Sequence, residues 1–128
     1  ILEVLGSSLH DFFSDDKEDT IVFRKEDFFE NEQEDYTISY IVPNAQKNSV
    51  EPIKITVNPG GSSESVAPHD GEDFGFVLSG CAELVYGGER YTLDEGDTFY
   101  VYCNENYHIE NNTKAPCSLI WISTPPFF

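Results

Sequence analysis

Short alternating segments separated by turn residues constrain the fold of this chain more than any other feature. Residues 36–42 and 53–57 place apolar side chains at every second position, the period of a half-buried strand. The turn at 58–61, Asn-Pro-Gly-Gly, ends the second segment. Further strands are expected at 74–78, 82–86, 90–93, 98–103, 108–110 and 118–123. About eight or nine strands at intervals of roughly 8–12 residues leave no room for helices between them, which predicts an all-β antiparallel sandwich or barrel.

Several of the predicted strands are apolar on both faces. Phe99 and Val101 alternate with Tyr100 and Tyr102, so neither side of that strand is polar. One face can fill the interior of the barrel. The other face needs either a second sheet or a second subunit to cover it.

The composition excludes several classes of function for these 128 residues. There are 24 acidic and 7 basic side chains, a net charge of −17, so neither nucleic acid nor an anionic membrane is an expected partner. No stretch approaches the ~20 apolar residues of a membrane span, and no signal peptide opens the chain. The 3 cysteines show no CxxC spacing, which indicates reduced thiols rather than a disulfide framework. We expect a cytoplasmic protein.

The leading part of the chain has a different character from the rest. Residues 1–13 predict the end of one helix, a stop at Gly6 and a short second helix, which together form no core of their own. Residues 14–35 are strongly acidic and predict a linker, with one short strand at 20–23. The interpretation is a helical remnant at 1–13, a linker at 14–35 and one β domain at 36–128. Because the chain also lacks methionine, we expect it to be a fragment of a longer protein.

Two stretches within the β domain have an informative spacing. The first contains, in order, Gly61, Ala67, Pro68, His69, Asp73 and Gly80, and the second contains Gly96, Asp97, His108 and Asn112. Together they resemble the two sequence motifs of the cupin family over about residues 53–121. The resemblance implies a cupin fold, which is a double-stranded β-helix or jelly-roll barrel.

The resemblance also implies a set of metal ligands. Cupins bind a divalent metal through two histidines and a carboxylate of the first motif and one histidine of the second. Here Ala67 occupies the place of the first histidine, so His69, Asp73 and His108 remain as implied ligands. Two histidines and a carboxylate suit Fe(II), and catalytic zinc also needs only three protein ligands; manganese and nickel stay open. Two departures from the second motif are a missing proline and a loop at 104–107 that is one residue longer. The alternative is that both histidines line a pocket without a metal.

Three further segments resemble one branch of the family. Residues 69–80, the ending at 121–127 and the opening at 2–13 are similar to the cupin regulators that carry an XRE-type helix-turn-helix domain. This resemblance implies the sensory and dimerisation domain of a bacterial transcriptional regulator rather than an enzyme. By this resemblance the domain would bind a small-molecule effector and supply the contacts of a homodimer. DNA would be bound only by an N-terminal helix-turn-helix domain that is absent from these residues.

The expected effector site is the mouth of the barrel. His69, Asp73 and His108 should converge there, and each aromatic candidate for the wall could instead belong to the core or to a dimer interface. The candidate wall residues are Tyr40, Phe76, Tyr100, Tyr107 and Trp121. A competing hypothesis is a small metal-dependent cupin enzyme, a dioxygenase or isomerase, that uses the same three ligands. A third is a storage or purely dimerising module.

Overall fold

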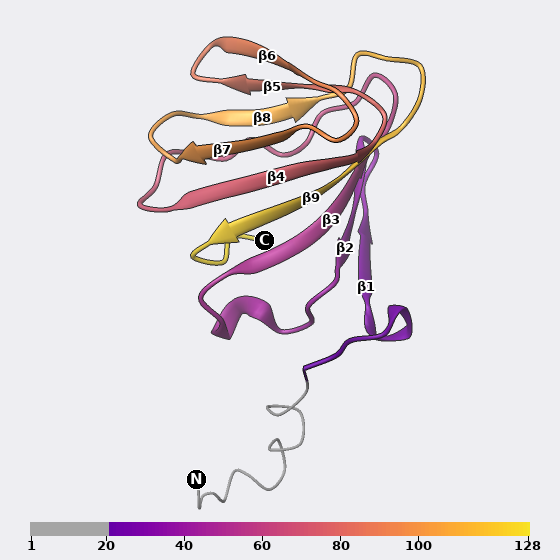
Figure 1. Ribbon diagram of the computed structural model, residues 1–128, viewed down its shortest axis with the longest axis vertical. Coiled ribbons are helices and arrows are strands. Elements are labelled where there is room, and N and C mark those ends of the chain that lie inside the picture. The colour runs from indigo at the N-terminus through magenta and orange to yellow at the C-terminus, as the bar shows by residue number, and fades with distance from the viewer. Residues whose placement is uncertain (1–20) are drawn as a thin grey trace, which may run out of the picture.

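The computed structural model describes residues 21–128, and nearly all regular structure in this range is β-strand (Figure 1). Two 3₁₀ turns are present, η1 at Lys25–Asp27 and η2 at Ala45–Lys47. The strands are β1 Phe29–Glu32, β2 Tyr36–Tyr40, β3 Glu51–Val57, β4 Glu72–Ser79, β5 Ala82–Tyr86, β6 Glu89–Leu93, β7 Thr98–Tyr102, β8 Tyr107–Glu110 and β9 Cys117–Thr124. The prediction of an all-β fold is confirmed. No helix in the described range is long and apolar enough to span a membrane.

The strands form two antiparallel sheets. The larger has the order β1-β2-β3-β9-β4-β7 and the smaller has the order β6-β5-β8. In Figure 1 the smaller sheet lies at the top of the view, with β7 and β4 below it. Isolated bridges from Ser62 to Glu110 and from Val66 to Tyr107 extend the smaller sheet on its β8 side. Both sheets contribute to one core of buried residues, as expected for a jelly-roll barrel.

The core follows the two-residue period of the strands. Along β3 and β9 every second residue is buried, and these buried positions pair with one another across the sheet. Trp121 packs edge-on against Phe99, with ring centroids 6.4 Å apart, and also contacts Tyr107 at 5.8 Å. Gly75 faces the same space, where a Cβ atom would lie 2.1 Å from the Phe99 ring. A glycine is therefore required at 75 because the aromatic ring fills the volume of a side chain.

The N-terminal boundary of the sheet differs from the prediction. Strand β1, at 29–32, lies within the segment interpreted as linker and pairs with β2. All of its residues are exposed, so it has no apolar period from which a strand could be predicted. Residues 21–23 do not form the short strand expected at 20–23. The predicted helical remnant at 1–13 lies outside the described residues.

Candidate functional site

Polar side chains point into one end of the barrel. Glu51 on β3 pairs with Ser123 on β9, and Ser123 pairs with Asp73 on β4, so the three lie side by side on the inner face of the sheet. All three are buried, and the two carboxylic residues are each 1% exposed. Buried carboxylates need partners, because an unpaired charge is costly in an apolar interior. We therefore ask which atoms of Glu51 and Asp73 already have a partner within the protein, because the remaining atoms are free to contact a ligand.

Asp73 has only one of its two oxygens satisfied. The hydroxyl of Tyr107 donates a hydrogen bond to Asp73 Oδ2, and Trp121 Nε1 donates to the same hydroxyl oxygen at 3.1 Å. Asp73 Oδ1 is buried and has no hydrogen-bond partner. Burial, followed by the hydrogen bond to Asp73, raises the pKa of Tyr107 far above its usual range, which keeps the hydroxyl a donor. An unsatisfied buried carboxylate oxygen marks a place for a cation or a hydrogen-bond donor.

His69 supplies a second unsatisfied atom. Its Nδ1 lies 3.0 Å from the carbonyl oxygen of Ala67. Since a carbonyl can only accept, the ring proton that makes this contact lies on Nδ1, and Nε2 is the nitrogen available to a ligand. Nε2 is buried without a hydrogen-bond partner. Phe127 stacks on the imidazole with ring centroids 5.9 Å apart, which holds the ring in place.

Cys103 completes this group, although we did not predict it from the sequence. One ligand atom from each of His69, Asp73 and Cys103 lies within 4.8 Å of the others, and such a set could hold a divalent cation. Burial, followed by the charge of Asp73, raises the pKa of the Cys103 thiol to about 12. A signal for its position was available, because Cys103 continues the inward phase of Phe99 and Val101 beyond the end of β7.

The structure does not bring His108 to this site, which corrects the prediction. Its neighbours Tyr107 and Ile109 are buried, whereas His108 lies on the opposite face of β8 with its Nε2 2.7 Å from Glu110 Oε2. The extra loop residue explains this, because a shift of one residue moves every side chain of a strand to the other face. The inward pair is Tyr107 and Asn111, which preserves the four-residue interval one position earlier; Asn111 is buried and donates to two backbone carbonyls.

The other aromatic candidates divide between the site and the surface. Trp121 and Tyr107 are 1% exposed and belong to the buried end of the barrel. Tyr40 lines a pocket of about 240 Å³ together with Glu51 and Phe128, beside that end. Phe76 and Tyr100 are 37% and 58% exposed on the outer face of the larger sheet, so the structure does not place them at the site.

The C-terminal residues cover the site. No pattern in the sequence predicts this cover. The backbone N–H of Phe128 donates to Glu51 Oε1 at 2.6 Å, and the Phe128 ring packs on Trp121 with centroids 5.1 Å apart. The hydroxyl of Ser123 donates to the Pro125 carbonyl at 3.0 Å. These contacts fold the segment after β9 over the barrel end, so a ligand that reaches Asp73 must displace this segment or pass beside it.

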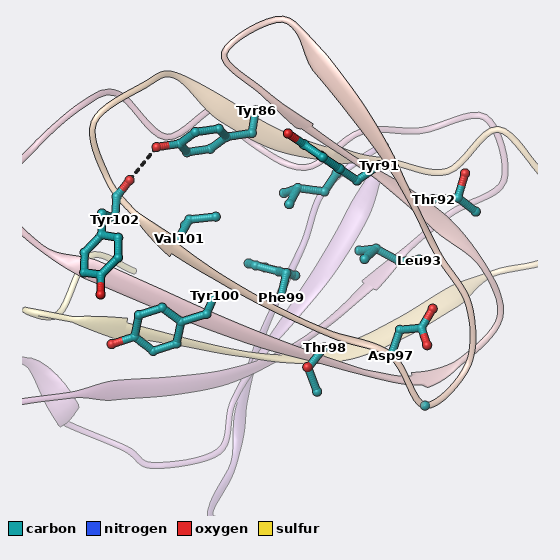
Figure 2. Close-up of a pocket in the computed structure, with 12 residues that line it drawn as sticks. Tyr86, Tyr91, Thr92, Leu93, Asp97, Thr98, Phe99, Tyr100, Val101 and Tyr102 are labelled. Atoms are coloured by element: carbon teal, nitrogen blue, oxygen red, sulfur yellow. Dashed lines mark hydrogen bonds between the residues drawn. The ribbon is translucent and has the colours of Figure 1, made fainter.

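A separate groove of about 790 Å³ runs between β7 and the β5–β6 hairpin (Figure 2). Tyr86 crosses its end and donates to the Tyr102 carbonyl at 2.6 Å. The one carboxylate in its lining, Asp97, accepts a hydrogen bond from the backbone N–H of Asp94 at 2.8 Å. The groove therefore offers mainly aromatic and aliphatic surface. Within the described residues, the buried polar side chains that could contact a ligand lie instead at the buried end of the barrel.

Comparison with known proteins agrees with this architecture. The profile of the family described as "Cupin domain" matches residues 53–123. The chain is a cupin. This cupin is 26% identical over 131 residues to the HTH-type transcriptional regulator PuuR of Escherichia coli, covering 100% of the chain and 71% of the relative. This relative is a helix-turn-helix regulator, which is the kind of protein that the sequence resemblance predicts.

Solved structures share the fold. The cupin domain of an XRE family transcriptional regulator from Enterobacter cloacae has a TM-score of 0.65 and 19% identity, covering 73% of this chain and 100% of that one. A predicted oxalate decarboxylase from Thermotoga maritima has a TM-score of 0.71 and 14% identity, covering 81% of this chain and 98% of that one. At such identities these structures show the fold alone, and this fold serves both regulators and enzymes.

Proposed function

We propose that this cupin is the sensory and dimerisation domain of a transcriptional regulator. The proposal rests on the similarity to PuuR, which extends over the whole chain and includes residues that precede the cupin match at 53–123. In this proposal a helix-turn-helix domain outside these residues binds DNA, and the cupin itself is not an enzyme. A regulator of this kind acts in the cytoplasm. The net charge of −17 suits a domain that does not itself rest on DNA.

We place the effector at the buried end of the barrel. His69 and Asp73 offer one acceptor atom each without a partner, while Tyr107 and Trp121 form an aromatic wall beside them. The segment that carries Phe128 covers this end, so its position is coupled to occupancy of the site. An effector changes DNA binding only if it prefers one arrangement of the dimer, and movement of this segment would supply that difference.

We propose a second copy of the chain as the partner of the outer face of β4 and β7. Phe76, Leu78, Tyr100 and Tyr102 are exposed there, on the two neighbouring strands at one edge of the larger sheet. Helix-turn-helix domains read DNA as dimers with a fixed separation of their half-sites. A sheet face that joins two cupin domains would provide that separation.

Two measurements test the regulatory proposal. Sequencing the gene upstream of the codon for Ile1 should reveal a helix-turn-helix domain, and its absence would overturn the proposal. DNA selected on the full-length protein should then be released by one member of a panel of amino acids, polyamines and sugars. In the full-length protein Asp73→Asn should bind DNA normally and lose this response, whereas Glu89→Gln, at an exposed position on β6, should keep it. An unchanged response in Asp73→Asn would place the effector elsewhere.

A metal-dependent cupin enzyme, a dioxygenase or isomerase, is the second candidate function. The unsatisfied His69 Nε2 and Asp73 Oδ1 favour it, because two buried atoms at one barrel end could each give a lone pair to a metal ion. His108 faces away from them and cannot serve as the third ligand without a rearrangement of β8. An oxygen electrode with iron(II)-loaded protein and a panel of organic acids tests the dioxygenase. Oxygen uptake that is lost in Asp73→Asn would support it, and equal uptake by both proteins would exclude it.

A further inference from the structure

We propose that Cys103, together with His69 and Asp73, forms a binding site for a divalent cation of the zinc class. The three residues come from separate elements: the loop before β4, β4 itself and the residue that follows β7. One ligand atom from each lies within 4.8 Å of the others. Ligand atoms around tetrahedral zinc, at about 2.0–2.3 Å from the metal, lie roughly 3.5 Å apart. Small side-chain rotations therefore bring the set to coordination distance.

The unsatisfied atoms of the barrel identify the same site independently of its geometry. Among residues 21–128, two buried side-chain nitrogen or oxygen atoms lack a hydrogen-bond partner, His69 Nε2 and Asp73 Oδ1. Both belong to this group of three. Leaving two such atoms unpaired in one place is costly for an empty interior, and a cation that accepts both lone pairs removes the cost.

The surrounding contacts orient the donors in the way that metal sites require. The Ala67 carbonyl fixes the proton of His69 on Nδ1, so Nε2 is free to coordinate. The Tyr107 hydroxyl, itself held by Trp121 Nε1, occupies Asp73 Oδ2 and leaves Oδ1 free. Such outer contacts fix the orientation of ligands and raise metal affinity. His108 has no part in this arrangement.

The donor set selects the class of ion. A sulfur ligand beside an imidazole and one carboxylate favours zinc over magnesium or calcium, which prefer oxygen ligands alone. Binding displaces the thiol proton of Cys103 to solvent as the sulfur–metal bond forms. Three protein ligands leave a fourth position open, and a small molecule with an oxygen, nitrogen or sulfur donor could close it. This inference deepens the proposed effector site, and the fourth position rests on that proposal.

Cobalt(II) is the probe that reports the sulfur ligand directly. The chain is purified in reduced form without affinity-tag metal and titrated with cobalt(II) chloride. We expect one equivalent to bind and to produce a thiolate-to-cobalt charge-transfer band in the near ultraviolet. Cys103→Ser should abolish the band, while Cys81→Ser and His108→Ala should retain it. A band that survives in Cys103→Ser, cobalt binding without the band, or no binding would each overturn the site.

A second variant guards against misfolding. His69 is only half-buried, so His69→Ala should keep the fold, measured by circular dichroism, and lower cobalt affinity at least tenfold. Unchanged affinity in this variant would overturn the role of His69. If cobalt does not bind, the metal site is overturned, but the DNA and effector measurements of the full-length protein still test the regulatory proposal. Conversely, a gene without a helix-turn-helix domain would overturn the regulatory proposal and leave the cobalt result standing, so the two failures are distinguishable.

Discussion

Tyr107 connects several side chains at the buried end of the barrel. Its ring packs against Trp121 and Phe99, and its hydroxyl bridges the Trp121 N–H and the Asp73 carboxylate. We predicted Tyr107 as a wall residue of the pocket. Its second role, in the place that the second cupin motif gives to a histidine, follows only from the inward phase of β8.

We predict that Tyr107→Phe destabilises the protein by about 1–3 kcal/mol, because it leaves both Asp73 oxygens and the Trp121 N–H without a partner. Urea unfolding followed by tryptophan fluorescence measures the change. The matched control is Tyr91→Phe at an exposed position on β6, expected within about 0.5 kcal/mol of the wild type. Equal stabilities for both variants would contradict the bridging role of the hydroxyl.

Gly75 gives a second prediction for a single residue. Gly75→Ala should cost about 1–3 kcal/mol, since the new methyl group would overlap the Phe99 ring, which Trp121 and Tyr107 hold in place. Thermal or urea unfolding measures the loss. The double variant Gly75→Ala/Phe99→Leu should lose less than the sum of the two single changes, because the smaller side chain makes room. Simple additivity would show that the two positions do not compete for space.

At the scale of elements, ion pairs on the outer face of the smaller sheet connect its three strands. Arg90 on β6 lies 2.8 Å from Glu83 on β5 and 2.8 Å from Glu110 on β8. His108 adds a contact to Glu110 at 2.7 Å. The network spans all three strands, which gives His108 a structural role in place of the predicted ligand role.

We predict a pH dependence of stability from this network. Hydrogen bonds from Arg90 and then His108 lower the pKa of Glu110 from 4.5 to about 2. A carboxylate with a lowered pKa in the folded state stabilises the protein fully above 4.5, and its contribution is lost as the pH falls toward 2. At pH 7 Glu110→Gln should therefore be less stable by about 1 kcal/mol. The difference, followed by urea unfolding, should shrink below pH 4.5 and vanish near pH 2. A pH-independent difference would assign the effect to packing.

At the scale of the whole molecule, the proposal that two copies of the chain associate through the outer face of β4 and β7 gives a testable prediction. We predict that Tyr100→Ser/Tyr102→Ser weakens the dimer at least tenfold, since aromatic side chains at the centre of an interface contribute most to binding. Analytical ultracentrifugation measures the dissociation constant. Tyr91→Ser, at a residue 51% exposed on β6, is the matched control and should leave dimerisation unchanged. A wild-type protein that sediments as a monomer at all concentrations would contradict the proposal.

The fold class can be predicted from the sequence because the two-residue period and the turns between segments are local signals. Strand β1 cannot, because its residues are all exposed and the strand exists through its pairing with β2. The cover formed by Phe127 and Phe128 cannot either, since no local pattern states where a chain end will pack. In the site, the motif spacing predicts His69 and Asp73 near one barrel end, and the structure shows those two side by side.

The sequence by itself determined the succession of strands from β2 to β9, the cupin family and the spacing of His69 and Asp73, because each of these is set by residues close together in the chain. The tertiary structure alone decided that Cys103 joins them and that His108 does not. The physical reason is the register of the strands. One extra loop residue reverses which side of β8 faces the barrel, and the meeting of side chains from β4 and β7 depends on pairing that no single segment encodes.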